Sequence, residues 1–243
     1  MRYRLSKRPI YNRESYILDL VEGKSVLHLG AAQANDDCNL EKFDRFINDE
    51  SFLHRWLTQK ARNCVGIDYN AELVDRLRDA HGYENIFVAN LEDKDSLKDI
   101  YGKYDFIIMG ELIEHLSNPG IVLNNIRRFM DANTQLCITT PNAWAIKNWL
   151  FCMAGFESHD EDHLSIYSPR LLEKILEKEG FTIKDYAYYQ TTYKQTKNNK
   201  WNYYSKSPRS FNAIIGIIVI NAFLRVRSSF ADGLIMIATK SDN

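Results

Sequence analysis

Residues 104–116 read Tyr-Asp-Phe-Ile-Ile-Met-Gly-Glu-Leu-Ile-Glu-His-Leu. The apolar residues 106–109 end at Gly110, a pattern typical of a strand that is buried on both faces. Polar side chains follow, because Glu111 comes directly after the glycine and Glu114 and His115 come three and four residues after Glu111. The segment therefore predicts a strand whose carboxyl end carries ionisable groups.

Similar apolar runs recur along the chain, and stretches with apolar residues at helical spacing lie between them. Strands that alternate with helices indicate βαβ units, right-handed crossovers and a parallel sheet. We therefore expect a doubly wound α/β fold. Its strands are predicted over 25–30, 63–68, 85–90, 104–110 and 134–140, and its helices over 52–61, 71–80 and 118–130.

The last hundred residues show a different sequence pattern. Bulky apolar side chains over 143–155 predict a helix. Ser168-Pro169 opens a second, amphipathic helix over 170–179, which Gly180 closes. The runs 181–193 and 234–239 are rich in β-branched and apolar residues and predict two further strands.

Composition excludes several classes of protein. The chain has 243 residues, 45% of them hydrophobic, and 31 basic residues against 32 acidic ones. These values argue against a polycation, a disordered chain or a disulfide scaffold. The four cysteines show no CxxC spacing, so we expect reduced thiols and a cytoplasmic protein. No signal peptide is predicted at the N-terminus, and the apolar run 211–224 is too short to span a bilayer.

Ligands of open parallel sheets bind at the carboxyl ends of the strands. There, Gly30-Ala31-Ala32 offers small side chains that let a ligand approach the backbone. Asp68 ends the next strand and is placed to accept hydrogen bonds from a ribose diol. The alternatives are a tight turn at Gly30 and a helix N-cap at Asp68. Together the two positions favour a nucleoside-type ligand, although the first is not a GxGxxG loop.

A resemblance extends this interpretation. The segments Val26-Leu-His-Leu-Gly-Ala, Val65-Gly-Ile-Asp, 104–116 and Ile138-Thr-Thr-Pro-Asn resemble the consecutive motifs of class I S-adenosylmethionine-dependent methyltransferases. Residues 159–163, followed by Tyr167-Ser-Pro-Arg and Glu179-Gly-Phe, extend the match over roughly 25–189.

The resemblance implies a Rossmann-like, mostly parallel sheet of seven strands whose last strand, 234–239, is antiparallel. It implies one methyltransferase domain over 1–243: a helical extension (1–24), a cofactor-binding core (25–142) and substrate-side elements (143–243) with a basic insertion (186–231). Two positions depart from the family pattern, because His28 stands where an acid is usual and Ala32 where a second glycine is usual. The cofactor residues it implies are Gly30, Ala31, Ala32, Asp68, Tyr69, Asn90, Leu91 and Gly110.

Three roles remain open for the residues after Gly110. His115, with Glu111 beside it, is a candidate base that takes the proton of an acceptor hydroxyl. The E-x-x-E-H pattern is also similar to that of metal-dependent small-RNA 2′-O-methyltransferases and ubiquinone-pathway O-methyltransferases. A divalent metal would then be bound by Glu111, Glu114, His115 and His163, or His159 in place of the last. The third alternative is a structural role.

The insertion 186–231 holds seven basic residues, interleaved aromatic residues and no acidic one. It is interpreted as the surface for a glycan acceptor, as a contact with an anionic membrane through 206–227, or as a surface that packs on the sheet or on a second subunit of a homo-oligomer. Nucleic acid is the least favoured partner.

We therefore expect an O-methyltransferase that acts on a saccharide or cell-surface glycan hydroxyl, free or lipid-linked. Residues 53–61 resemble a subgroup of sugar and glycan methyltransferases. One alternative is a metal-dependent O-methyltransferase of an RNA 2′-hydroxyl or a quinone precursor. The other is a non-catalytic nucleotide-binding module.

Overall fold

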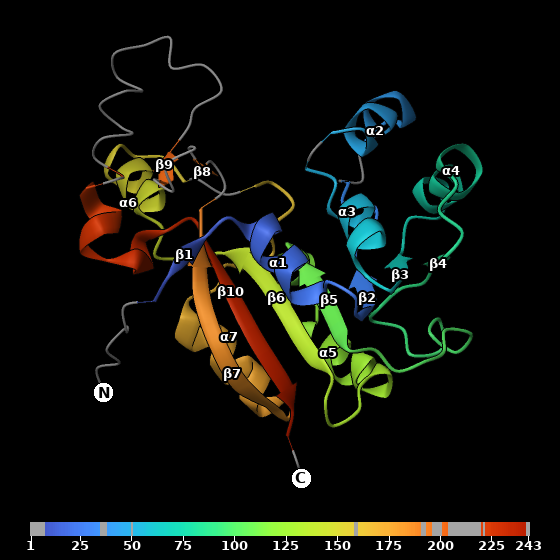
Figure 1. Ribbon diagram of the computed structural model, residues 1–243. Helices are drawn as coiled ribbons and strands as arrows, with labels where there is room; N and C mark the ends of the chain where they lie inside the picture. The colour runs from blue at the N-terminus through green and yellow to red at the C-terminus, as the bar shows by residue number, and fades with distance from the viewer. Residues whose placement is uncertain are drawn as a thin grey trace.

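The computed structural model describes residues 8–34, 38–49, 51–157, 160–190, 193–195, 201–203, 220 and 222–241. Its main sheet has eight strands in the order β1-β7-β10-β6-β5-β2-β3-β4 (Figure 1). The bounds, in that order, are Ile10–Tyr11, Phe181–Tyr189, Gly233–Lys240, Gln135–Pro141, Phe106–Gly110, Ser25–Leu29, Asn63–Asp68 and Ile86–Val88.

Strand direction agrees with the predicted fold. Strands β6, β5, β2, β3 and β4 pair in parallel, whereas β10 is antiparallel to both β6 and β7. The doubly wound, Rossmann-like α/β prediction with an antiparallel last strand is therefore confirmed.

The predicted number of seven strands is wrong by one. Ile10 and Tyr11 form β1, which pairs in parallel with β7. The sequence analysis assigned 1–24 to a helical extension because two residues are too few to show a period. Their strand conformation depends on the free edge of β7, which is more than 170 positions away in the chain.

Helices cover both faces of the sheet (Figure 1). Leu27 and Leu29 of β2 pack in one apolar cluster with α5 and α7, whereas Val26, which precedes Leu27, packs on the other face with α1 and α3. Helices α2 and α4 share a third cluster. The bounds of α1 to α7 are Arg13–Val21, Leu40–Ile47, Leu53–Lys60, Ala71–His81, Pro119–Ile126, Ile146–Met153 and Pro169–Lys178.

Side-chain caps explain where several helices begin. The side chains of Asn12, Asn39, Asn70 and Ser168 each accept a hydrogen bond from a backbone N–H of the first turn. Gly180 after α7 has φ +76°, as the predicted helix end requires. Helix α2 was not predicted, because only Phe43 and Ile47 of its eight residues are buried. Short 3-10 turns occupy Ile113–His115, Arg127–Phe129 and Ser228–Phe230.

The basic insertion begins later than predicted. Strand β7 continues to Tyr189, and both Tyr188 and Tyr189 are fully buried, so these aromatic rings belong to the core and not to an exposed acceptor surface. The predicted strand 181–193 is correspondingly broken, and β8 (Tyr193–Gln195) instead pairs with β9 (Trp201–Tyr203).

Most of the predicted membrane-contact segment, 206–219, lies outside the described residues, as do Lys197 and Lys200. Residues 222–226 are helical, and Arg225 and Arg227 are exposed. Within the described part of the chain, no helix is long and apolar enough to cross a membrane.

A tight contact links the last strand to β7 and provides a test of this packing. Gly233 of β10 pairs with Tyr189, and a Cβ atom at position 233 would overlap the Tyr189 ring. We expect Gly233→Ala to lower the free energy of unfolding by about 1–3 kcal/mol, because the buried ring must move. Urea denaturation measures the change.

The control for this substitution is Gly120→Ala. There the new Cβ would lie 3.0 Å from a carboxylate oxygen of Glu179, at the end of a flexible side chain that can move aside. Alanine is also the better helix former at this position in α5. Equal stability losses in the two variants would contradict the packing described for Gly233.

Candidate active site

The carboxyl ends of the parallel strands meet at one edge of the sheet. Because β3, β2 and β5 are neighbours, Asp68, Gly30 and Gly110 follow one another along this edge. The sheet thus brings together polar and small residues that are up to 80 positions apart in the sequence, as predicted.

Gly30 and Asp68 lie at the neighbouring ends of β2 and β3. Gly30 has φ +70°, and a Cβ atom there would lie 3.1 Å from Leu112 Cδ1, so both conformation and space favour glycine. The carboxylate of Asp68 is buried and accepts hydrogen bonds from Ala32 N (2.9 Å) and Asn70 N (3.1 Å).

Asp68 is not the cap of the following helix. Asn70 caps α4, because its side chain accepts the hydrogen bond from Leu73 N. The N-cap alternative for Asp68 is therefore wrong, and the main-chain bonds to its carboxylate instead connect the β2 and β3 turns.

The other predicted cofactor residues line the same edge. Tyr69 has an exposed fraction of 57%, Leu91 is buried, and Asn90 is exposed with its side-chain oxygen bonded to Glu92 N at 3.0 Å. Gly110 is buried at the end of β5. Residues 90 and 91 follow β4, which is the outermost strand on that side of the sheet.

His28, which stands where the family usually has an acid, faces a second histidine. Its Nδ1 lies 3.1 Å from Nδ1 of His54 in α3, and both rings are buried and stacked. Burial lowers the pKa of His28 well below its ordinary value, and it lowers the pKa of His54 to about 4. Both rings are therefore neutral at pH 7.

Glu111 is held by residues from both ends of the chain. It has φ +52°, and its Oε2 accepts a hydrogen bond of 2.7 Å from the buried Tyr189 hydroxyl. Arg13 Nη1 of α1 lies 3.7 Å from its Oε1. The nearby charges of Glu111 and Glu14 raise the pKa of Arg13 above its ordinary value despite the opposing effect of burial. Sequence reasoning missed Arg13 and Tyr189 because their contact with Glu111 depends on strand order.

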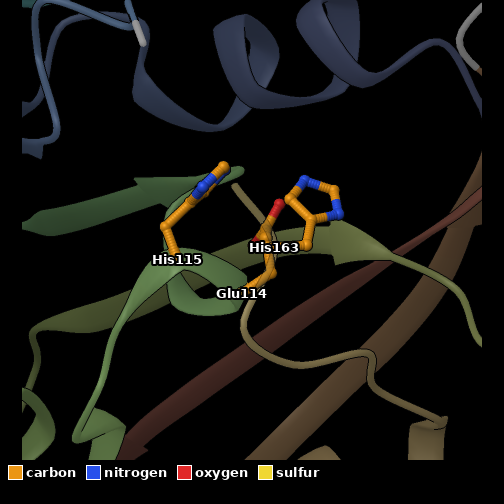
Figure 2. A group of neighbouring side chains, drawn as sticks. All are labelled: Glu114, His115 and His163. Atoms are coloured by element: carbon orange, nitrogen blue, oxygen red, sulfur yellow. The ribbon is translucent and has the colours of Figure 1, made fainter. Parts of the chain in front are cut away.

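Glu114, His115 and His163 come together at the centre of the edge (Figure 2). One ligand atom from each lies within 4.8 Å of the others. Glu114 is 1% exposed; its Oε2 accepts a hydrogen bond from Thr140 Oγ1, and its Oε1 has no hydrogen-bond partner among the described residues. Burial and the charge of Glu111 raise the pKa of Glu114 above its ordinary range.

A surface loop brings His163 to this cluster. Leu164 N and Ser165 N both donate to the Glu114 carbonyl oxygen, at 2.9 and 3.1 Å. The ring centroids of His115 and His163 are 4.7 Å apart. Glu111 lies outside this group of three, and His159 lies outside the described residues.

The loop also lines a cavity of about 460 Å³ next to His163. Its described lining residues are Glu157, Asp160, Glu161, His163, Leu164, Ser165 and Ile166. The volume is that of a small-molecule site.

Comparison with known proteins now identifies the family. A family model described as a methyltransferase domain matches residues 2–185. The chain belongs to the class I S-adenosylmethionine-dependent methyltransferases. Among curated proteins, none matches the sequence.

Solved methyltransferases share the fold of this methyltransferase. One from Archaeoglobus fulgidus is 19% identical, with 94% of this chain and 91% of the other covered and a TM-score of 0.52. A TehB-like enzyme from Corynebacterium glutamicum is 13% identical, with 95% and 88% covered and a TM-score of 0.51. A chain of the complex of the Haloferax volcanii Trm112 methyltransferase activator with a methyltransferase is 13% identical, with 94% and 88% covered and a TM-score of 0.55.

Family membership explains the chemistry of the edge. The enzyme uses S-adenosylmethionine, whose ribose diol and uncharged adenine suit a carboxylate beside small residues. The buried Asp68 carboxylate and the close approach at Gly30 fit such a ligand.

The buried histidine pair predicts a loss of stability in mild acid. In the unfolded chain His54 titrates near 6.5, whereas in the folded chain its pKa is about 4. At His54 the unfolded state therefore binds one more proton between these pH values. This residue alone lowers the free energy of unfolding by roughly 3 kcal/mol as the pH drops through them. Urea denaturation at pH 7, 6, 5 and 4 measures this slope.

Two variants test whether the pH dependence of the free energy of unfolding comes from the buried His54 ring. His54→Gln should flatten it by about one proton, whereas His81→Gln, which replaces a half-buried ring paired with Asp44, should retain it. A slope unchanged in His54→Gln would contradict a neutral, buried His54.

Proposed function

We propose that this methyltransferase transfers the methyl group to a hydroxyl of a saccharide or cell-surface glycan, free or lipid-linked, with His115 as the general base. The observation that carries the proposal is the orientation of the His115 ring. Its Nδ1 lies 3.1 Å from the carbonyl oxygen of Asp162. A carbonyl oxygen can only accept, so Nδ1 donates and Nε2 is left with its lone pair available for a proton.

The proton and charge balance of the step is simple. S-adenosylmethionine supplies a methyl group bound to a positively charged sulfur. As the acceptor oxygen bonds to that carbon, the carbon–sulfur bond breaks and the hydroxyl proton passes to Nε2 of His115. Glu111, which is held by Tyr189 and Arg13, lies on the same loop as His115.

Two tryptophans support a saccharide acceptor. Trp144 and Trp149 follow the carboxyl end of β6, are 40% and 50% exposed, and stack at 6.4 Å with an angle of 30° between their rings. Exposed, nearly parallel indole faces suit the apolar face of a sugar ring. The segment 53–61 contributes less to this argument, because Leu53, His54 and Leu57 point into the core.

We propose Gly30, Ala31, Ala32, Asp68, Tyr69, Asn90, Leu91 and Gly110 as the cofactor-binding residues. In this arrangement Asp68 binds the ribose hydroxyls and the Gly30 turn passes the methionine part of the ligand.

These roles predict opposite effects of two substitutions. We expect His115→Gln to lower kcat about 100-fold while the Kd for S-adenosylmethionine stays unchanged, because only proton transfer is lost. Asp68→Asn should instead weaken cofactor binding about tenfold or more, because hydrogen bonds to a charged acceptor are lost. Calorimetry and single-turnover assays measure the two quantities. Weakened cofactor binding in His115→Gln would indicate a structural role for the ring.

A second candidate is supported by the cluster of Glu114, His115 and His163. Together they offer a carboxylate oxygen and two imidazole nitrogens, a ligand set that suits a divalent metal which polarises the acceptor hydroxyl. Such a metal would be expected in an O-methyltransferase of an RNA 2′-hydroxyl or a quinone precursor.

Metal removal separates the two candidates. With His115 as base, turnover should survive excess EDTA within about twofold, and added Mg²⁺ or Mn²⁺ should not raise it. Turnover that EDTA abolishes and a divalent ion restores would establish the metal-dependent alternative and overturn the metal-free step. His163→Ala serves as the matched variant, since it removes a candidate metal ligand and leaves residue 115 itself unchanged.

Membrane contact through 206–227 belongs to the same proposal for a lipid-linked acceptor. In its described part, Phe223 and Val226 are exposed next to the exposed Arg225 and Arg227, so apolar and basic side chains share one turn. A cytoplasmic location and a homo-oligomer stay predictions. The alternative of a non-catalytic module is not retained, because the match to a methyltransferase domain supports an enzyme.

A further inference from the structure

Helix α6 has apolar side chains on its outer face as well as on its inner one. Ile146 is buried, and Leu150, one turn later, packs against the main core cluster. On the outside, Trp149 and Met153 lie one turn apart and are 50% and 75% exposed, and Phe156 just beyond the helix is 66% exposed. A helix that is apolar on all sides is normally covered by another surface.

The sequence around these side chains carries no charge. No charged residue occurs between Lys147 and Glu157, and the residues over 151–156 are all apolar or small and all exposed. Acidic residues begin at Glu157, on the loop that leads to His163, so the apolar surface ends there. A contiguous apolar stretch of this kind marks a contact with a partner.

Hydrogen bonds connect the start of α6 to the segment before β10. Asn142, four residues before the helix, donates bonds of 2.9 and 2.8 Å to two carbonyl oxygens in 229–231. The helical residues 222–226 precede this segment and lie next to α6 (Figure 1). Their Leu224 belongs to the same apolar cluster as Ile146.

This neighbouring segment is basic. Arg225 and Arg227 are exposed, and the sequence has no acidic residue over 186–231. Phe223 and Val226 beside them are 40% and 68% exposed and add to the apolar surface. Apolar side chains bordered by positive charge are the combination that binds an anionic lipid surface.

We propose that α6 and residues 222–227 dock on a lipid bilayer with anionic headgroups, with Met153 and Phe156 at the boundary between headgroups and acyl chains. The inference rests on the proposed function where it concerns the acceptor, and it favours the lipid-linked form over the free glycan. Indole rings prefer the headgroup layer, where the sugar of such an acceptor lies. Because α6 follows the carboxyl end of β6, this layer would adjoin the candidate active site.

Charge favours a bilayer over a second copy of the chain. In a two-fold symmetric dimer the same surface lies on both sides of the interface. Arg225 and Arg227 would then face a second pair of arginines, and the stretch 186–231 supplies no acid to pair with them. Anionic headgroups instead attract both side chains.

Vesicle binding tests the inference without any acceptor. The full chain is mixed with vesicles of phosphatidylcholine that contain about 30% phosphatidylglycerol, at low ionic strength, and sedimentation gives the partition coefficient. We expect binding that falls about fivefold or more with pure phosphatidylcholine, because two arginines lose their anionic partners.

The double variant Phe151→Ser/Met153→Ser should lower the partition coefficient about tenfold or more, because two apolar side chains are lost from the contact. The control, Ile121→Ser/Leu171→Ser, removes two apolar side chains, each 47% exposed, from α5 and α7. It should bind vesicles as the unchanged chain does. Urea denaturation checks that both variants are folded.

A second pair of variants tests the charge. Arg225→Gln/Arg227→Gln should remove the preference for phosphatidylglycerol, whereas Lys94→Gln/Lys98→Gln, which removes the same charge from exposed positions between β4 and β5, should keep it.

Several results would overturn the inference. They are no binding to the anionic vesicles, equal losses in Phe151→Ser/Met153→Ser and its control, and a preference for phosphatidylglycerol that survives Arg225→Gln/Arg227→Gln. A dimer without lipid that Phe151→Ser/Met153→Ser dissociates, read by sedimentation velocity, would also overturn it, because a second copy would then cover α6.

Turnover distinguishes failure of this inference from failure of the proposed function. Methylation of a soluble glycan by a chain that binds no vesicles would overturn the membrane surface and leave the proposed function intact. Vesicle binding with methylation of no saccharide, free or lipid-linked, would support the membrane surface and overturn the proposed function.

Discussion

The hydrogen bond from the Tyr189 hydroxyl to Glu111 Oε2 connects the candidate active site to β7 of the sheet. It depends on β10, which enters the sheet antiparallel between β6 and β7 and sets Gly233 beside Tyr189. Strand β1 pairs with β7 on the other side, and α1 begins two residues after it. Arg13 therefore reaches Glu111 from the opposite end of the chain. One register determines both contacts, so a slip of one residue would turn Tyr189 to the other face.

The local sequence pattern was sufficient to predict those strands whose side chains are buried on both faces of the sheet. Apolar runs such as 106–109 predict strands because both faces of a parallel strand are buried, and Ser168 and Gly180 mark α7 because capping is local chemistry. Strand β1 has no such signal, since its conformation depends on a distant free edge. The candidate site likewise contains residues that the local sequence predicts and contacts that only the fold determines. Asp68 could be predicted from its position at a strand end, whereas the bond from Ala32 N and the partners of Glu111 depend on the fold.

Charge is distributed differently from what the sequence average suggests. The net charge of −1 combines a basic stretch, 186–231, with an otherwise acidic chain. The structure adds that the cavity wall next to His163 is itself acidic. Exposed carboxylates around a cavity act mainly on selectivity, since like charges are rejected on approach.

Glu114 lies in one cluster with His115 and His163. Burial and the charge of Glu111 favour the uncharged state of Glu114, whose carboxyl group lies beside the imidazoles of His115 and His163. A divalent ion would reverse this state, since a carboxylate ligand must be ionised and the two imidazole nitrogens must give up their lone pairs. Nε2 of His115 cannot hold a metal and accept a proton at once. The protonation state of Glu114 therefore distinguishes two mutually exclusive mechanisms on one set of side chains.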